Sequence, residues 1–216
     1  MQTLKFQDSI EHTLRWIEGD LKNKPLLIKV AGPSCAGKTT FADNLISASS
    51  GREKIRSSID KSIGWLPLDD FFRDLDDPLI PRNDEGLPIF DVPESYCSEE
   101  YSTVVAKLLS GEECLAPVYN LAKNRRYGEV KIKGMQILVT EGLFSIDFCQ
   151  KIPVVSLSVY VEADRSVCEE RRVTHDMNFL HIPEDVAREH FNRVVWPLSE
   201  RYVVPQRELA HLVVRT

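Results

Sequence analysis

Residues 31–41, AGPSCAGKTTF, have the residue types and the spacing that a chain needs to hold phosphate. Gly32 and Gly37 allow backbone torsions that turn successive N–H groups toward phosphate oxygens. Lys38 can reach the β- and γ-phosphates, and the hydroxyl of Thr39 can ligate Mg²⁺. The pattern Gly-x-x-x-x-Gly-Lys-Thr therefore predicts a nucleoside triphosphate site.

The surroundings of this loop meet the structural requirement of the motif. The apolar run at residues 26–31 predicts a strand before it, and residues 39–49 predict a helix after it. A chance match to four constrained positions is expected in about one chain of this size in a hundred, so we prefer the functional interpretation to a helix-capping turn. The residues predicted to bind the triphosphate are Gly32, Pro33, Ser34, Cys35, Ala36, Gly37, Lys38, Thr39 and Thr40.

Carboxylates follow two further predicted strands. Asp69 and Asp70 end the run at residues 63–68, and Glu141 ends QILVTEG. Open α/β sheets form their ligand crevice at the carboxyl ends of the strands. Phosphoryl transfer requires one carboxylate to orient a hydroxyl and others to hold Mg²⁺ or its water. A lone carboxylate could equally cap the next helix, but two such strand ends beside a phosphate loop favour catalysis.

The elements needed to position these residues are predicted by hydrophobic periodicity. Apolar residues recur every three or four positions over residues 6–21, which predicts a helix with one buried face. The later strands and helices alternate, which indicates an α/β fold with a mainly parallel sheet flanked by helices. Residues 114–134 are the exception and predict an inserted β-hairpin. Residues 164–183 predict a charged helical lid. We expect residues 1–24 to pack on a single domain of residues 25–216.

Composition narrows the class of protein. The 216 residues carry a net charge of −6, which argues against a general nucleic-acid binder. The five cysteines are scattered and form no C-x-x-C pair, so a reducing compartment is favoured. We find neither a signal peptide nor an apolar run of membrane-spanning length. The sequence thus indicates a cytoplasmic protein with no membrane partner; a homo-oligomer remains open.

Several motifs together resemble the uridine kinases and their relatives, which include nicotinamide riboside kinases, phosphoribulokinases and bacterial pantothenate kinases. The motifs are GPSCAGKTTFADNL, LPLDDFF, IFDVPES, APVYN…RR, ILVTEGLF and VVWPLSERYVVPQRELAHLVV. They occur in the family's order between residues 26 and 214. The resemblance implies a P-loop NTPase fold and an ATP- and Mg²⁺-dependent kinase acting on a small molecule.

The resemblance also implies roles for individual residues. Asp69 corresponds to the carboxylate that takes or orients the proton of the acceptor hydroxyl. The phosphate-loop motif already assigns Lys38 the catalytic role of neutralising charge on the phosphoryl group. The residues that would hold Mg²⁺ or its bound water are Thr39, Glu141 and Asp69. The lid residues Arg171 and Arg172 would contact the phosphates of ATP. The residues that would bind the acceptor are Asp91, Tyr119, Asn124 and Arg126.

The hairpin departs from the uridine kinase pattern. The family's base-reading histidine is replaced by Asn124, and Asn120 replaces an aspartate. An amide still donates and accepts hydrogen bonds, but it does not present the same pattern. The resemblance leads us to expect a nucleoside as the acceptor, phosphorylated on its 5′-hydroxyl. Because the hairpin departs from the uridine kinase pattern, nicotinamide riboside, pantothenate or another sugar-like alcohol are the alternatives. A non-catalytic nucleotide-binding regulator is the alternative of another class.

Overall fold

The computed structural model describes residues 2–52, 63–84 and 86–216. Six strands form one sheet in the order β1-β8-β7-β2-β6-β3, and every neighbouring pair is parallel. The strands are β1 (Gln2–Lys5), β2 (Leu26–Ala31), β3 (Gly64–Pro67), β6 (Ile137–Glu141), β7 (Val155–Glu162) and β8 (Leu212–Arg215). The predicted α/β fold with a mainly parallel sheet is confirmed.

Strand β2 lies inside the sheet, between β7 and β6, and all of its residues except Lys29 are apolar. All six of its residues are buried. Ile28 and Val30 point into one hydrophobic layer, whereas Leu27 and Ala31 point into the other. This alternation follows from the two-residue period of a strand and places the end of β2 deep between the two layers.

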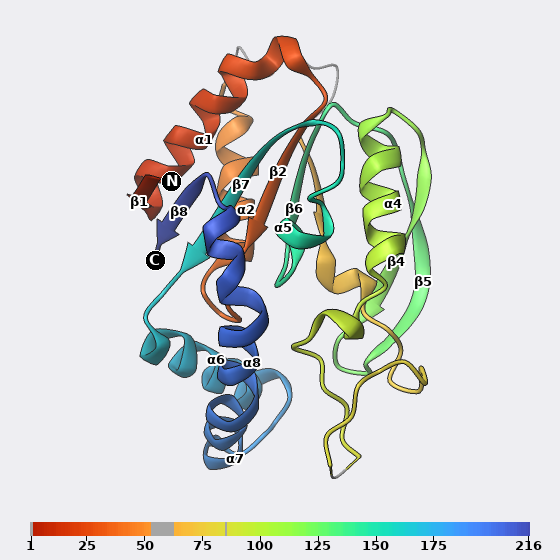
Figure 1. Ribbon diagram of the computed structural model, residues 1–216, viewed down its shortest axis with the longest axis vertical. Coiled ribbons are helices and arrows are strands. Elements are labelled where there is room, and N and C mark those ends of the chain that lie inside the picture. The colour runs from red at the N-terminus through yellow and green to blue at the C-terminus, as the bar shows by residue number, and fades with distance from the viewer. Residues whose placement is uncertain (1, 53–62, 85) are drawn as a thin grey trace.

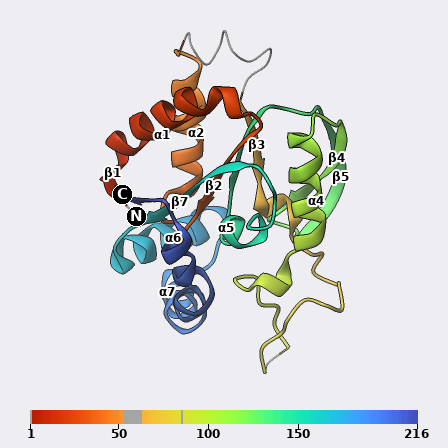
Figure 2. The same cartoon turned by 45° about the horizontal axis from the view of Figure 1, so that its top comes forward.

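Helices cover both faces of the sheet (Figures 1 and 2). The first layer contains α1 (Phe6–Asp20) and α2 (Lys38–Ser49), whose facing residues include Leu14 and Leu45. The opposite layer contains α4 (Ser98–Leu109) and the short α5 (Ser145–Phe148). Helix α1 thus packs on the same core as the strands, through apolar residues spaced three and four apart.

Strand β1 was not predicted from the sequence. It pairs with β8 at the edge of the sheet, with Gln2 opposite Leu212. Its four residues are mostly exposed, so the segment lacks the apolar signal of a buried strand. The backbone pairing to a strand about 210 residues away in sequence defines it instead.

Antiparallel strands β4 (Cys114–Asn120) and β5 (Arg125–Ile132) form the predicted hairpin beside the main sheet. Its inner residues, among them Ala116 and Tyr119, join the apolar layer of α4. The hairpin is therefore anchored against the segment that follows β3.

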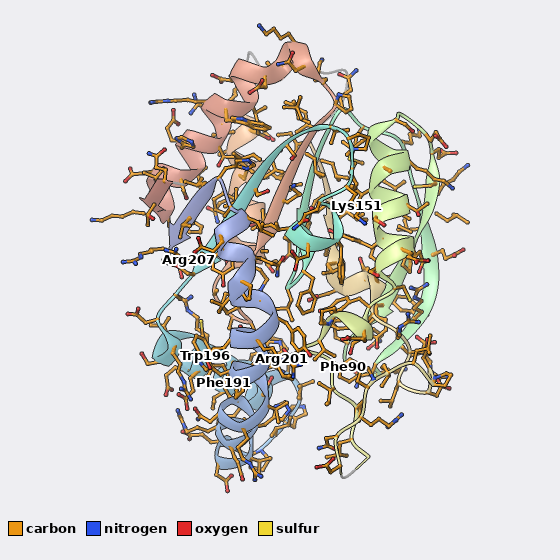
Figure 3. All side chains as sticks on the ribbon, in the orientation of Figure 1. Phe90, Lys151, Phe191, Trp196, Arg201 and Arg207 are labelled. Atoms are coloured by element: carbon orange, nitrogen blue, oxygen red, sulfur yellow. The ribbon has the colours of Figure 1, made fainter. Side chains whose placement is uncertain are left out.

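The expected lid, residues 164–183, contains α6 (Arg165–Phe179), and α7 (Glu184–His190) follows it. Helix α7 is followed by a helical column in which α8 (Trp196–Leu198) lies between π-helical turns at Phe191–Val195 and Ser199–Val203. The rings of Phe191 and Trp196, labelled in Figure 3, are 5.8 Å apart and pack this column together. Within the described residues, no helix is both long enough and apolar enough to cross a membrane.

Short 3₁₀ turns occur at Leu21–Asn23, Leu68–Phe71, Pro93–Ser95 and Val204–Leu209. One of them corrects a detail of the sequence interpretation. Asp69 and Asp70 do not end a strand, because β3 stops at Pro67 and both aspartates lie in the 3₁₀ turn that follows. The turn still leaves them at the carboxyl edge of the sheet, beside the ends of β2 and β6.

Candidate active site

The phosphate loop leaves β2 through a close approach to β7. Gly32 has φ of 150°, and a Cβ atom there would lie 2.0 Å from the carbonyl oxygen of Val161. No other residue fits without moving the backbone of β7. The loop then closes with a hydrogen bond from the Ala36 amide to the Pro33 carbonyl and enters α2 at Lys38. Backbone amides at the start of a helix form an anion site, as the sequence pattern predicts.

Lys38 is buried under the loop that it follows. Its Nζ donates to the carbonyl oxygen of Pro33 at 2.9 Å, which holds the ammonium group inside the curve of the loop. The neighbouring Thr39 is exposed, and its Oγ1 donates to Oε2 of Glu141 at 3.4 Å. The loop and the end of β6 therefore present a cation, a hydroxyl and a carboxylate at one edge of the sheet.

Glu141 is held in a low-dielectric position. The residue is only 5 % exposed to solvent. Burial, together with the nearby charge of Asp69, raises the pKa of Glu141 to about 7, against the attraction of Lys38. Two close carboxylates disfavour each other's ionisation, and a nearby cation favours it.

The two aspartates of the turn face different partners. Asp69 is buried among the charges of the site: burial raises its pKa, Lys38 lowers it, and the charges of Asp70 and Asp91 raise it further. Asp70 instead accepts a hydrogen bond from the backbone amide of Tyr119 through Oδ1, at 3.1 Å. Asp70 therefore anchors the hairpin, whereas Asp69 interacts electrostatically with Lys38 of the phosphate loop.

Gly142, directly after Glu141, lets this turn approach β6. A Cβ atom at Gly142 would lie 2.4 Å from the Cβ of Leu68, and its φ is 153°. The sequence reasoning missed this residue, because a glycine after a strand end gives no sign of which segment lies against it. The close approach brings Asp69 and Glu141 within reach of one ligand.

Asp91 and Arg172 form the link between the acceptor side and the lid. Burial raises the pKa of Asp91, while the charges of Arg172, His190 and Lys38 lower it. The guanidinium of Arg172 donates through Nη1 to Oγ of Ser34 at 3.0 Å. It also donates through Nε to both carboxylate oxygens of Asp176, at 3.0 and 2.9 Å. One lid arginine thus contacts the phosphate loop and interacts electrostatically with the carboxylate predicted to bind the acceptor.

Arg171 joins the lid to the other side of the loop. Its Nη1 donates to the carbonyl oxygen of Cys35 at 3.3 Å and to Oγ1 of Thr216 at 3.1 Å. The hydroxyl of Thr216 in turn donates to the carbonyl oxygen of Ala36 at 2.9 Å. Both predicted lid arginines therefore contact the phosphate loop directly.

The hairpin residues are less uniform. Tyr119 is buried, and its hydroxyl donates to the carbonyl oxygen of Arg73 at 3.0 Å. The guanidinium of Arg126 pairs with Glu100 of α4 through two hydrogen bonds, at 3.0 and 2.5 Å. Asn124 has a left-handed φ of 47°, and its carbonyl oxygen accepts from the Leu75 amide. These contacts anchor the hairpin to α4 and to the segment after β3.

The oxygen atoms present fit a magnesium–triphosphate complex. Mg²⁺ usually takes one or two protein oxygens and completes its shell with water and phosphate oxygens. The hydroxyl of Thr39 and the carboxylate of Glu141 meet at 3.4 Å, and Asp69 lies beside them. Residues 2–52, 63–84 and 86–216 contain no cluster of three or more His, Cys, Asp or Glu that would hold a metal by itself.

Three residues of this network were missed by sequence reasoning. Asp176 could have been found, because it stands four positions after Arg172 on one helix face. His190 and Thr216 carried no signal, because their contacts bring together segments distant in sequence. Tertiary structure alone places them.

The chain is similar to known proteins over most of its length. The sequence profile of the phosphoribulokinase / uridine kinase family matches residues 27–216. A uridine kinase of Halobacterium salinarum is 25 % identical over 188 residues, which cover 87 % of this chain and 78 % of the relative.

Two solved structures share the fold. A candidate uridine kinase from Bacillus stearothermophilus aligns with a TM-score of 0.66 and 16 % identity, over 96 % of this chain and 98 % of the other. A candidate kinase of a fructose transport system from Silicibacter aligns with a TM-score of 0.69 and 18 % identity, over 98 % of both chains. These likenesses confirm the P-loop kinase fold.

Proposed function

Because the chain belongs to the phosphoribulokinase and uridine kinase family, and is therefore a small-molecule kinase, we propose that it transfers the γ-phosphoryl group of ATP to the 5′-hydroxyl of a nucleoside. The observation that carries the proposal is the position of Asp69. This buried carboxylate interacts electrostatically with Lys38 of the phosphate loop and with Asp91. A hydroxyl placed between the two aspartates would lie in front of the triphosphate.

In the proposed reaction, Asp69 accepts the proton of the acceptor hydroxyl while the oxygen of that hydroxyl attacks the γ-phosphorus. The bond between that phosphorus and the oxygen bridging to the β-phosphate breaks, and ADP leaves. Lys38 stabilises the charge that develops on the transferred group. When bound, Mg²⁺ would neutralise phosphate charge beside Thr39 and Glu141. Because the protein has little covalent chemistry to perform, positioning by these residues is its main contribution.

The phosphate loop, residues 32–40, would bind ATP, and the lid arginines would complete that subsite. Arg172 and Arg171 already contact Ser34 and the Cys35 carbonyl, so each lies within a side-chain length of the loop interior. A guanidinium can exchange a neutral oxygen for a phosphate oxygen with a gain in hydrogen-bond strength. We expect both to move onto the phosphates when ATP binds.

The acceptor subsite would comprise Asp91, Tyr119, Asn124 and Arg126. Asp91 can accept hydrogen bonds from sugar hydroxyls, and the ring of Tyr119 can contact a base. Of the four residues, Asn124 has the least support as an acceptor-binding residue, because its backbone carbonyl is hydrogen-bonded to the segment after β3. Because the hairpin sequence differs from the uridine kinase pattern at Asn120 and Asn124, the alternative acceptors are nicotinamide riboside, pantothenate or another sugar-like alcohol.

A panel of acceptors tests the proposal. The purified protein is incubated with ATP and Mg²⁺ and with uridine, cytidine, nicotinamide riboside, pantothenate or a simple sugar, and ADP release is measured together with the mass of the acceptor. We expect a phosphorylated nucleoside. Tight ATP binding without any phosphorylated acceptor would instead favour a non-catalytic nucleotide-binding regulator. The intact set of Lys38, Thr39, Asp69 and Glu141 argues against that second class.

A further inference from the structure

A buried tyrosine in the acceptor region has a hydroxyl without a protein partner. Tyr96 is 1 % exposed, and its Oη has no hydrogen-bond partner among the described residues. Burying a hydroxyl unpaired costs about 1–3 kcal/mol. Native structures contain few such groups, and each one requires an explanation. Phenylalanine would fill the same space without that cost, so the hydroxyl itself needs a role.

The ring of Tyr96 is fixed by aromatic neighbours. It stacks on Phe72 with centroids 4.1 Å apart and planes inclined by 27°. Phe144 meets its edge at 5.6 Å, and Phe148 lies 6.1 Å away. Phe90, labelled in Figure 3, packs edge-on against Phe72 at 5.6 Å and stands next to Asp91 in the chain. The phenol therefore cannot turn away to find another partner.

The backbone fixes this ring relative to the catalytic turn. Phe72 and Tyr96 form an isolated antiparallel bridge. The Cys97 amide donates to the Phe71 carbonyl at 2.8 Å, and the Arg73 amide donates to the Ser95 carbonyl at 2.9 Å. The segment that carries Tyr96 is thus paired to the segment that follows Asp69.

The charges around the phenol identify the cluster that it faces. Beyond the effect of burial, the charges of Asp69, Asp91 and Glu141 raise the pKa of Tyr96, and that of Arg172 lowers it. The pairing of Phe72 with Tyr96 holds the phenol beside the turn that carries Asp69, within range of these charges. A phenol in that setting stays protonated and serves as a hydrogen-bond donor.

We propose that Tyr96 is a substrate-binding residue whose hydroxyl donates a hydrogen bond to a second hydroxyl oxygen of the acceptor. This inference rests on the proposed function and deepens it. That second hydroxyl donates its own proton to Asp91, so one acceptor oxygen satisfies both a carboxylate and a phenol. The site then selects polyhydroxylated, sugar-like alcohols, because an acceptor without the second hydroxyl leaves Tyr96 Oη unpaired.

The experiment compares Tyr96→Phe with the wild type, using two acceptors that differ by one hydroxyl. With a ribonucleoside that the wild type phosphorylates, we expect kcat/KM for the acceptor to fall about fivefold to tenfold, as for one lost hydrogen bond. The KM for ATP should not change. With the matching 2′- or 3′-deoxynucleoside, the wild type should already be slower, and Tyr96→Phe should cause no further loss. An equal loss with ribo and both deoxy acceptors, or no loss with any, would overturn the inference.

Tyr101→Phe is the matched control. Tyr101 is equally buried, belongs to the same apolar layer, and likewise has a hydroxyl without a hydrogen-bond partner among the described residues. Besides burial, however, its pKa is raised by Cys149 and Glu141 rather than by Asp69 and Asp91. Removing that oxygen should leave the KM for the acceptor unchanged. A shift in the concentration of Mg²⁺ needed for half-maximal rate in Tyr96→Phe, with no change in acceptor discrimination, would place the hydroxyl on metal-bound water and would also overturn the inference.

A stability measurement separates this inference from the proposed function. An unpaired hydroxyl contributes nothing to the ligand-free fold, so Tyr96→Phe should keep or raise the Tm measured without ligands. A clear fall in that Tm would reveal a structural partner and refute the inference, even if the wild type phosphorylates no acceptor in the panel. If the wild type proves inactive but binds ribonucleosides, the same ribo and deoxy pair is compared by thermal shift. Equal shifts in wild type and variant refute the inference, and so does the absence of any shift.

Discussion

Glu141→Gln should stabilise the ligand-free protein at alkaline pH while inactivating it. The glutamate is 5 % exposed and its pKa is raised from 4.5 to about 7, because burial and the charge of Asp69 both disfavour ionisation. Above pH 7 the folded protein must therefore keep a buried carboxylate ionised. Glutamine occupies nearly the same volume, can still accept from Thr39, and carries no charge.

The magnitude follows from the pKa difference. Each pKa unit corresponds to about 1.4 kcal/mol, so a rise from 4.5 to about 7 destabilises the folded state by about 3 kcal/mol once the group is ionised in both states. The sign is that of a raised acid pKa: the folded state binds the extra proton, so the penalty is absent below pH 4.5, grows between pH 4.5 and 7, and is complete above pH 7. Near pH 5 it should amount to less than about 1 kcal/mol.

Urea denaturation in EDTA, without nucleotide, measures this effect. At pH 8.5 we expect Glu141→Gln to exceed the wild type by about 3 kcal/mol in the free energy of unfolding, and at pH 5 the two should nearly coincide. Comparing the difference between the proteins at the two pH values cancels the titration of groups far from the substitution. An equal difference at both pH values, or a less stable variant at pH 8.5, would refute our description of Glu141 as a destabilised buried carboxylate.

Two further experiments test the phosphate loop and the hairpin. The Lys38→Ala variant should fold normally, because the lysine ammonium contacts the loop rather than an apolar layer. Its kcat in a coupled ADP assay should be lower by at least about 100-fold. A purified, folded variant with wild-type turnover would contradict the assignment. Arg126→Gln should raise the KM for the acceptor more than Glu100→Gln does, with little change in the KM for ATP. Equal effects of the two substitutions would mean that the Arg126–Glu100 pair only supports the hairpin.

The fold was largely predictable because its signals are local. The strand–glycine loop–helix sequence of residues 26–49 needs only the order of apolar residues, two glycines and a lysine, and the structure places β2 and α2 there. The hairpin and the lid helix were likewise predicted within a few residues of their observed bounds. Each depends on contacts between neighbours in the chain, which periodicity records.

The remaining features depend on contacts between distant segments. Strand β1 is defined by its pairing with β8, and the 3₁₀ turn at Asp69 is shaped by the close approach of Gly142 to Leu68. The sequence also could not show that the hydroxyl of Tyr96 is left unpaired, since a tyrosine in an apolar segment is normally a packing residue. Such features require the arrangement of all surrounding elements.

The most direct test of the central claim compares Asp69→Asn and Asp70→Asn in a single turnover. The protein, in excess over ATP, is mixed with ATP and the acceptor, and the phosphorylated acceptor is quantified by mass. We predict that Asp69→Asn binds ATP and acceptor nearly as the wild type does but transfers phosphate about 10²–10⁴ times more slowly, because the hydroxyl loses its proton acceptor. Asp70→Asn should be only mildly slower, since its amide oxygen can still accept from Tyr119. Loss of transfer in Asp70→Asn with an active Asp69→Asn would contradict the account.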